Sequence, residues 1–471
     1  MALLFNSAGF AVFFPLVCLA YFATPHPRRW ITLLVASCIF YMAFIPAYIV
    51  VLAGLILIDY TAALAMEPAR GRRRRAILVV SLAANVGMLG LFKYYNFAVG
   101  ALHAPLPLVR WALPLGLSFH TFQSMAYTIE VYRERFPAER HLGRYALYVM
   151  FFPQLVAGPI ERPAHLLPQF LERHAFDPER AADGLKLMAW GFFKKLVIAD
   201  GLSGAVDAVY TSPATHHAAS ITAATLFFAV QIYCDFSGYT DIAIGAAEVI
   251  GFRLVKNFSR PYLARSIREF WSRWHISLST WFRDYVYIPL GGNRVSPPRW
   301  AFNILLTFLI SGLWHGANWT FIVWGALHGL YMVAGRATEP IRRRWRAPFE
   351  HSGATSIVRA GQIVTTFVLV SFGWVFFRAA SLGDALTLLG RLGDWSINDL
   401  DSLGLTHLQL LVLSLATIVL FTIEFGAPTD DVRLLLGGRP VWVRWTAYYG
   451  LVTAVLLLGA FNASKFIYFQ F

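Results

Sequence analysis

The sequence predicts an all-α polytopic membrane protein. The first observation is composition: 57% of the 471 residues are hydrophobic and only 14% are charged, whereas a soluble domain averages about 25% charged residues. The second is the recurrence of apolar segments near the length of about 20 residues that a helix needs to cross a bilayer. The third is that arginines gather in short loops between these segments, as cytoplasmic loops of membrane proteins do. The net charge of +14 therefore indicates membrane orientation and not nucleic-acid binding.

Four apolar segments precede residue 100, and we expect each to form a membrane helix: residues 10–22, 31–44, 48–66 and 76–97. Arginines follow the first segment, and a dense arginine cluster follows the third. Both basic loops fall on the cytoplasmic side if the amino terminus is outside.

The middle of the chain continues this alternation. Residues 113–132 are expected to form a fifth span, and residues 145–158 are too short and too broken by proline and glycine to cross. Irregular backbone at membrane depth must be buried in protein, so residues 145–158 are expected to be re-entrant. The next segment, 187–209, holds Lys194 and Lys195, which we expect to snorkel to the cytoplasmic surface.

The rest of the chain completes the predicted topology. Residues 361–377, 406–425 and 442–461 are expected to be closing spans. The arginine run at 342–346 precedes them on the inner side, and a loop with four aspartates, at 384–401, lies outside. Both termini then lie on the external face. No linker is long enough to separate a second domain, so residues 1–471 are expected to form a single membrane domain.

The functional prediction centres on His315, inside the apolar run 307–333. Ionisable side chains at membrane depth are costly, so an intramembrane one is a functional-site hypothesis by default. Gly312, Gly316 and Asn318 surround it, and glycine is a poor residue for continuing a helix. We expect a helix break that presents His315, with Trp314 and Asn318, to a cavity. The alternative is a histidine that packs against a neighbouring helix.

A second polar stretch, residues 269–293, contains His275. Read as one helix, it places Trp274 in an apolar stripe with three- and four-residue spacing, His275 beside that stripe and Ser279 one turn further on. Charged residues in the same stretch exclude a lipid-facing span. The stretch is therefore either an interfacial amphipathic helix or a helix that lines the same cavity as His315.

A third polar stretch, residues 231–245, places Asp235, Ser237 and Asp241 close together in sequence. Six residues separate the two aspartates, so a regular helix does not put them on one face. We expect Ser237 and Gly238 to break the helix and the carboxylates to pair with buried arginines. A part in orienting an active-site group is the alternative.

Two other histidines carry weaker signals. His120 and His328 are expected to make hydrogen bonds in the core. Metal binding needs clustered ligands, and two histidines 40 residues apart, His275 and His315, do not supply them, so no metal site is predicted.

The polar stretches resemble the membrane-bound O-acyltransferase (MBOAT) family, and within it the bacterial branch of alginate O-acetyltransferase subunits of the AlgI type. The segments that carry the resemblance are FHTFQSMAYTIEVYR, AGPIERP, GFFKKLVIAD, QIYCDFSGYTDIAIG, GFRLVKNFSRPY, EFWSRWHISLSTWFRDYVYIPLGGNR, SGLWHGANWTFIVWGALHG and the final FIYFQF. They cover nearly the whole chain.

The resemblance implies an MBOAT fold with about 11 transmembrane helices and re-entrant elements around a funnel. It implies that His315 is the catalytic histidine and that His275 is the second motif histidine. It also implies acetyl transfer from a cytoplasmic donor, acetyl-CoA, with no permanently bound cofactor. A periplasmic partner of the SGNH-hydrolase type then completes transfer to a polysaccharide such as alginate or another exopolysaccharide.

Attack by a hydroxyl on a thioester needs a base whose pKa is near neutrality. Burial lowers the pKa of a histidine, because it disfavours the charged form of the imidazole. The sequence leaves open whether His315 deprotonates the acceptor or accepts the acyl group itself. It also leaves open D-alanyl transfer from a carrier protein toward teichoic acid, and a transporter or flippase. Transporters of that class often carry internal repeats of spans, and no such repeat is visible.

Overall fold

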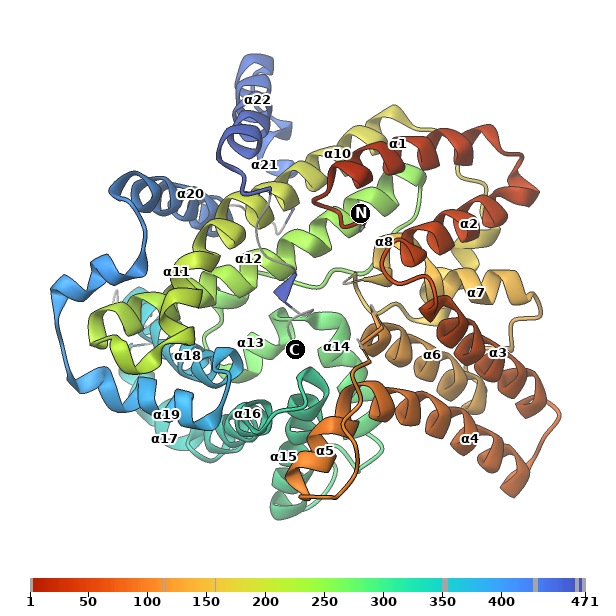
Figure 1. The fold of residues 1–471 in the computed structure, drawn as a ribbon, viewed down its shortest axis with the longest axis horizontal. Helices are drawn as coiled ribbons and strands as arrows, with labels where there is room; N and C mark the ends of the chain where they lie inside the picture. Colours follow the sequence, from red (N-terminus) through yellow and green to blue (C-terminus); the bar gives the residue numbers. More distant parts are fainter. Residues whose placement is uncertain are drawn as a thin grey trace. The chain divides into compact units, whose positions relative to one another are not determined.

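A computed structural model describes residues 3–111, 113–114, 116–156, 158–349, 355–426, 431–461 and 466–467 (Figure 1). These residues form helices and loops, with no strand in the described part of the chain, so the all-α prediction is confirmed. The chain divides into two compact units. Unit 1 comprises Met1–Phe192 and Tyr239–Lys256, and unit 2 comprises Phe193–Gly238 and Asn257–Phe471. The single-domain prediction stays a prediction.

Unit 1 contains the first ten helices. They are α1 (Ala8–Ala23), α2 (Arg29–Met42), α3 (Tyr48–Met66), α4 (Gly71–Leu89), α5 (Tyr95–Ala101), α6 (Leu117–Tyr132), α7 (Leu142–Met150), α8 (Phe152–Leu155), α9 (Pro163–Leu166) and α10 (Pro178–Phe192). The first four predicted segments correspond to α1 to α4, and the fifth predicted segment corresponds to α6.

The predicted re-entrant stretch is two short helices, α7 and α8, separated at Phe151. Residues 147–156 are all buried in the unit, as irregular backbone at depth requires. Position 157, which belonged to the same prediction, lies outside the described residues.

Unit 2 contains most of the remaining helices. They are α11 (Asp200–Thr211), α13 (Ile267–Arg273), α14 (Ile276–Phe282), α15 (Pro297–His315), α16 (Trp319–Ala337), α17 (Glu339–Arg346), α18 (Thr355–Arg378), α19 (Leu382–Gly390), α20 (His407–Gly426), α21 (Leu434–Gly437) and α22 (Val441–Leu458). The π-helical segment Phe193–Ala199 precedes α11.

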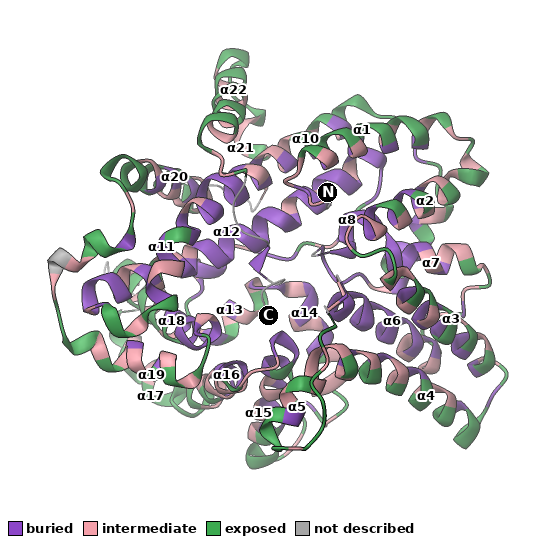
Figure 2. Ribbon diagram, viewed as in Figure 1, coloured by how far each residue is buried: buried purple, intermediate pink, exposed green. Residues whose placement is uncertain are grey.

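The 33-residue helix α12 (Ala218–Ile250) belongs partly to each unit, and it is largely buried (Figure 2). It runs without interruption through Ser237 and Gly238, so the predicted helix break there is wrong. A serine in a helix competes with the backbone for hydrogen bonds. Here the Ser237 hydroxyl instead accepts a hydrogen bond from Lys194 Nζ at 2.9 Å.

Helices α15 and α16 pack closely against each other. Glycines make this possible: a Cβ atom at Gly312 would lie 2.3 Å from the carbonyl oxygen of Phe321, and one at Gly325 would lie 2.4 Å from that of Phe308. Gly312 and Gly325 therefore allow the two helix backbones to approach each other.

Among the described residues, six helices are long and apolar enough to cross a bilayer: α3, α4 with its extension to Ala101, α12, α18, α20 and α22. The chain is therefore a multi-pass membrane protein. No residue of α22 is buried (Figure 2), as a lipid-facing helix allows. The expected count of about 11 spans stays a prediction.

Candidate active site

The predicted helix break at His315 is present. Helix α15 ends at His315, Gly316 is extended (φ −161°, ψ 150°), and Asn318 caps the start of α16. The Asn318 side-chain oxygen accepts a hydrogen bond from Thr320 N at 3.1 Å, and its amide donates to Ala380 O at 2.8 Å. Asparagine is among the preferred N-cap residues. The turn therefore fixes the position of His315 at the end of its helix.

The imidazole of His315 lies among aromatic rings and is only 4% exposed. The ring centroids of Trp314, Trp324 and Phe377 lie 4.8, 4.9 and 5.3 Å away, each ring steeply inclined to the imidazole. These rings come from α15, α16 and α18, so three helices together set the position of His315.

His275 lies at a break that the sequence did not predict. The stretch read as one helix is α13 and α14, joined at Trp274 and His275, and His275 has a left-handed backbone with φ 44°. Left-handed geometry is uncommon outside glycine. Trp274 and His275 are each 1% exposed, so the turn that joins the two helices is buried.

Asn257 holds the His275 turn. Its side-chain oxygen lies 3.1 Å from His275 Nδ1 and accepts hydrogen bonds from Ser277 N at 3.2 Å and Ser277 Oγ at 3.0 Å. Its backbone oxygen accepts from Ile276 N at 2.9 Å. Burial lowers the pKa of His275 to about 3, so the ring is neutral at physiological pH.

These contacts identify the tautomer of His275. The Ser277 backbone N–H can only donate, so the Asn257 atom that faces it is the amide oxygen. That oxygen accepts from His275 Nδ1 as well, which places the hydrogen on Nδ1. In a neutral ring Nε2 then carries the lone pair.

The two predicted catalytic histidines meet at one tryptophan. The ring centroid of Trp314 lies 6.4 Å from that of His275 and 4.8 Å from that of His315. Phe236 contacts His275 from another side, with centroids 4.6 Å apart and rings at 89°. The fold thus brings together residues 40 positions apart in sequence.

Asp235 belongs to a buried ionic cluster. Lys195 Nζ lies 2.6 Å from Asp235 Oδ1 and 2.7 Å from Asp200 Oδ1, and the three side chains are at most 4% exposed. The expected pairing of Asp235 with arginine is therefore wrong, because the cation is a lysine. The expected snorkelling of Lys194 and Lys195 is also wrong, since both are buried with polar partners.

A cavity of about 1890 Å³ lies within unit 2. Six of its lining residues are arginines and one, Glu339, is acidic; the arginines are Arg265, Arg268, Arg283, Arg336, Arg342 and Arg346. Its lining also includes Ser311, one helical turn before His315, and Ser279, one turn after His275. Neither histidine lines this cavity.

The other predicted supporting residues lie in different places. Ser279 lines the cavity, whereas Trp274 packs on Phe270 and Trp374, with centroids 5.5 and 5.1 Å away. Asp241 is half-buried. It lies in the part of α12 that belongs to unit 1, whereas Asp235 lies in the part that belongs to unit 2.

The two weaker histidines are both buried. His328 Nδ1 accepts a hydrogen bond from Trp271 Nε1 at 3.3 Å, which confirms its expected core role. His120 has no hydrogen-bond partner at Nε2 among the described residues, so the expected bond is not seen there. The described residues contain no group of three or more histidine, cysteine, aspartate or glutamate side chains suited to a metal ion.

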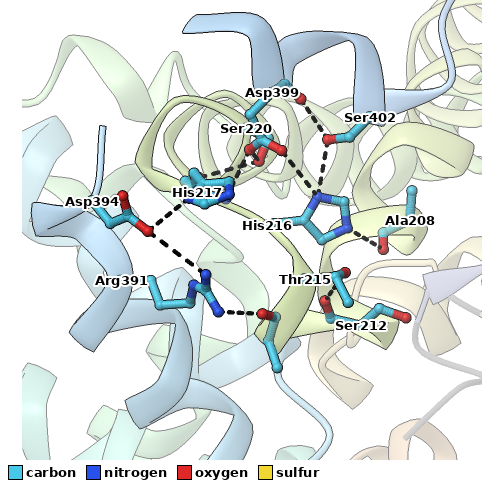
Figure 3. Close-up of polar contacts among 11 residues, drawn as sticks. Ala208, Ser212, Thr215, His216, His217, Ser220, Arg391, Asp394, Asp399 and Ser402 are labelled. Atoms are coloured by element: carbon cyan, nitrogen blue, oxygen red, sulfur yellow. Dashed lines mark hydrogen bonds and ion pairs between the residues drawn. The ribbon is translucent and has the colours of Figure 1, made fainter. Parts of the chain in front are cut away.

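Sequence reasoning missed a polar cluster at the start of α12 (Figure 3). Asp399 accepts hydrogen bonds from His217 N at 2.8 Å and from the Ser220 hydroxyl. His216 Nδ1 lies 3.0 Å from Ser402 Oγ, and His217 Nδ1 lies 2.7 Å from Asp394 Oδ2. Burial alone would raise the pKa of the Asp399 carboxyl. These hydrogen bonds and the nearby His216 outweigh burial and hold the pKa below its ordinary value. The partners are about 180 residues apart, and no local pattern connects them.

Comparison with known proteins gives the class of protein. The model of the membrane-bound O-acyltransferase family matches residues 117–378. The chain belongs to this family and is an acyltransferase.

Particular relatives extend this result. The chain is 40% identical to a probable alginate O-acetylase AlgI of Azotobacter vinelandii, over 87% of the chain and 82% of the relative. It is 33% identical to a peptidoglycan O-acetyltransferase of Helicobacter pylori, over 100% of the chain and 98% of the relative. Similarity to a teichoic acid D-alanyltransferase of Bacillus subtilis is lower, 28% over 58% of the chain and 70% of the relative.

Proposed function

We propose that the protein takes an acetyl group from acetyl-CoA at the cytoplasmic face and relays it across the bacterial inner membrane for O-acetylation of a polysaccharide. The observation that carries the proposal is the meeting of His275 and His315 at Trp314, in a unit that also holds an arginine-lined cavity. The acceptor class comes from the relatives, whose names include an alginate O-acetylase and a peptidoglycan O-acetyltransferase.

The arginine-lined cavity is the proposed donor site. Clefts lined by one sign of charge concentrate ligands of the opposite sign, and the phosphates of CoA are anionic. Arg342 and Arg346 line this cavity, and they belong to the arginine run that we expect to be cytoplasmic. The thioester end of the donor then extends toward Ser311 and Ile276, the lining residues nearest in sequence to His315 and His275.

His315 is the proposed general base. The acceptor hydroxyl oxygen attacks the thioester carbonyl carbon, a C–O bond forms and the C–S bond breaks. His315 takes the hydroxyl proton and passes it to the departing CoA thiolate. General bases contribute about 10²–10⁴-fold to the rate of such steps.

His275 is proposed to orient the acceptor. Its neutral ring carries hydrogen on Nδ1, which faces Asn257. Nε2 is then a hydrogen-bond acceptor, so it is suited to receive a hydroxyl hydrogen. It is not suited to polarise the thioester carbonyl, because that role needs a donor.

The membrane arrangement is part of the proposal. The arginine loops lie in the cytoplasm, both termini lie in the periplasm, and a periplasmic partner of the SGNH-hydrolase type passes the acetyl group to the polymer. The positive-inside distribution of arginine supports this orientation.

The experiment that tests the function is acetyl transfer from radiolabelled acetyl-CoA by the purified protein, with the candidate partner present. We expect His315→Ala to lower kcat by about 10²-fold or more and to leave donor binding nearly unchanged. His328→Asn is the matched control. It removes another buried imidazole of the same helix pair but keeps an acceptor for Trp271 Nε1.

Three outcomes would change the proposal. Retained activity in purified His315→Ala protein removes the proposed base. Label that stays on the wild-type protein, is released by hydroxylamine and is located at His315 by mass spectrometry identifies an acyl-histidine route in place of base catalysis. Transfer from a D-alanyl carrier protein but not from acetyl-CoA contradicts the proposed donor.

A further inference from the structure

The residues Phe466 and Ile467 return to the core of unit 2, and we call this pair the tail anchor. Ile467 N donates a hydrogen bond to Asp235 Oδ2 at 2.8 Å. The other oxygen of Asp235 lies 2.6 Å from Lys195 Nζ. Phe466 and Ile467 are 1% and 3% exposed. The buried ionic cluster therefore holds the backbone of a segment more than 230 residues away in sequence.

The tail anchor also contacts the ring that supports His275. Phe466 lies 5.8 Å from Phe236, and Phe236 lies 4.6 Å from His275, measured between ring centroids. Asp235 and Phe236 are adjacent in α12, so one turn of helix binds the tail anchor by its backbone and by its ring. Because protein cores are densely packed, a displacement of the tail anchor would be transmitted through Phe236 to His275.

A second attachment lies between α22 and the tail anchor. Ala460 N donates a hydrogen bond to Leu196 O at 3.0 Å. Leu196 belongs to the π-helical segment Phe193–Ala199, which also carries Lys195. Helices of the π type occur mostly as short bulges inside α-helices, and they are frequent at functional sites. The chain is thus attached to this segment just before the tail anchor, and at the tail anchor it is attached to Asp235, which Lys195 of the same segment contacts.

We infer that the tail anchor is a positioning element of the acyltransferase site, which holds Phe236 against His275 and so fixes the imidazole for the acceptor. The ionic cluster Lys195, Asp200 and Asp235 serves this role by binding the tail anchor. The catalytic consequence rests on the proposed function of His275, whereas the physical coupling does not.

Two substitutions each remove one of the two contacts that the tail anchor makes with α12. Phe466→Leu removes the ring that packs on Phe236, and Ile467→Pro removes the N–H that Asp235 accepts. Phe461→Leu is the matched control, because Phe461 precedes the tail anchor in sequence but is 49% exposed.

The first measurement is the rate at which diethylpyrocarbonate modifies His275 in the full-length protein in detergent, followed by mass spectrometry. We expect a several-fold faster reaction in Phe466→Leu and Ile467→Pro and no change in Phe461→Leu. Unchanged His275 reactivity in both variants, with the protein folded by its thermal transition, overturns the inference.

The second measurement is acetyl transfer. We expect both variants to lower kcat by about 10-fold or more, as small misplacements of a reacting group do, with KM for acetyl-CoA unchanged. If His275→Ala is fully active, the proposed role of His275 fails while the reactivity result still tests the coupling. A rise in KM alone, without faster modification, contradicts a positioning role.

Discussion

Asn257 determines which nitrogen of His275 carries hydrogen, and this is testable at the scale of one residue. The change Asn257→Asp keeps an oxygen facing His275 Nδ1 and Ser277 N. A carboxylate beside an imidazole favours its charged form. Burial now lowers the pKa of His275 to about 3, and the substitution raises it by about 1–3 units. The acid limb of the kcat profile should therefore move to higher pH.

The measurement is kcat for acetyl transfer across pH 4 to 8, a window of about four units chosen around the ordinary histidine value of ~6.5. Ser277→Ala is the control, since it removes one hydrogen bond to the same Asn257 oxygen and leaves His275 Nδ1 in place. We expect it to lower stability by about 1 kcal/mol without moving the acid limb. An unmoved limb in Asn257→Asp would show that the protonation of His275 does not limit catalysis.

Single residues also show where sequence reasoning stops. His315 and His275 were identifiable because polar side chains interrupt apolar runs. The burial of Lys195 was not identifiable from the sequence, because one of its partners, Asp200, is a neighbour and the other, Asp235, is distant in sequence. Before the fold is known, a lysine in an apolar segment is expected to reach water; a buried charge is tolerated only when the fold supplies its partner.

At the scale of elements, the contact between α15 and α16 depends on Gly312. A methyl group there would lie 2.3 Å from the Phe321 carbonyl oxygen, so Gly312→Ala must push the two helices apart. We expect a loss of about 1–3 kcal/mol, typical of overpacking, together with reduced activity because His315 ends the same helix. The measurement is the thermal transition of the purified protein in detergent.

The control for this prediction lies in the partner helix. A methyl group added at Gly335 of α16 would meet no described atom within 4 Å. Gly335→Ala should be neutral or stabilising by up to about 1 kcal/mol, from helix propensity alone. Equal transition temperatures for the two variants would mean that the glycine contact does not hold the helix pair.

Elements differ in how well their sequence predicts them. Continuous apolar segments were predicted to within a few residues, as for Tyr48–Met66. Breaks were harder. The break at His315 was predicted from Gly316 and Asn318, whereas the one at His275 was not, because the turn is held by Asn257, 18 residues earlier. The predicted break at Ser237 failed because Lys194 binds the serine hydroxyl.

At the scale of the whole molecule, the remaining prediction is the orientation of the chain in the membrane. Arg344 and Asp401 are both exposed, and α18 (Thr355–Arg378) lies between them. Its 24 residues span about 36 Å as a helix, enough for a hydrocarbon core of about 30 Å. We therefore expect the arginine run before α18 and the aspartates after it to face opposite compartments.

Cysteines introduced singly at these positions test the orientation. In intact cells a membrane-impermeant maleimide should label Asp401→Cys, and it should label Arg344→Cys only after permeabilisation. The wild-type chain is the background control, because Cys234 is buried and Cys18 and Cys38 are partly covered. Labelling of both positions in intact cells would mean that α18 does not cross. The reverse pattern would place the arginine-lined cavity in the periplasm, where acetyl-CoA is absent, and would contradict a cytoplasmic donor.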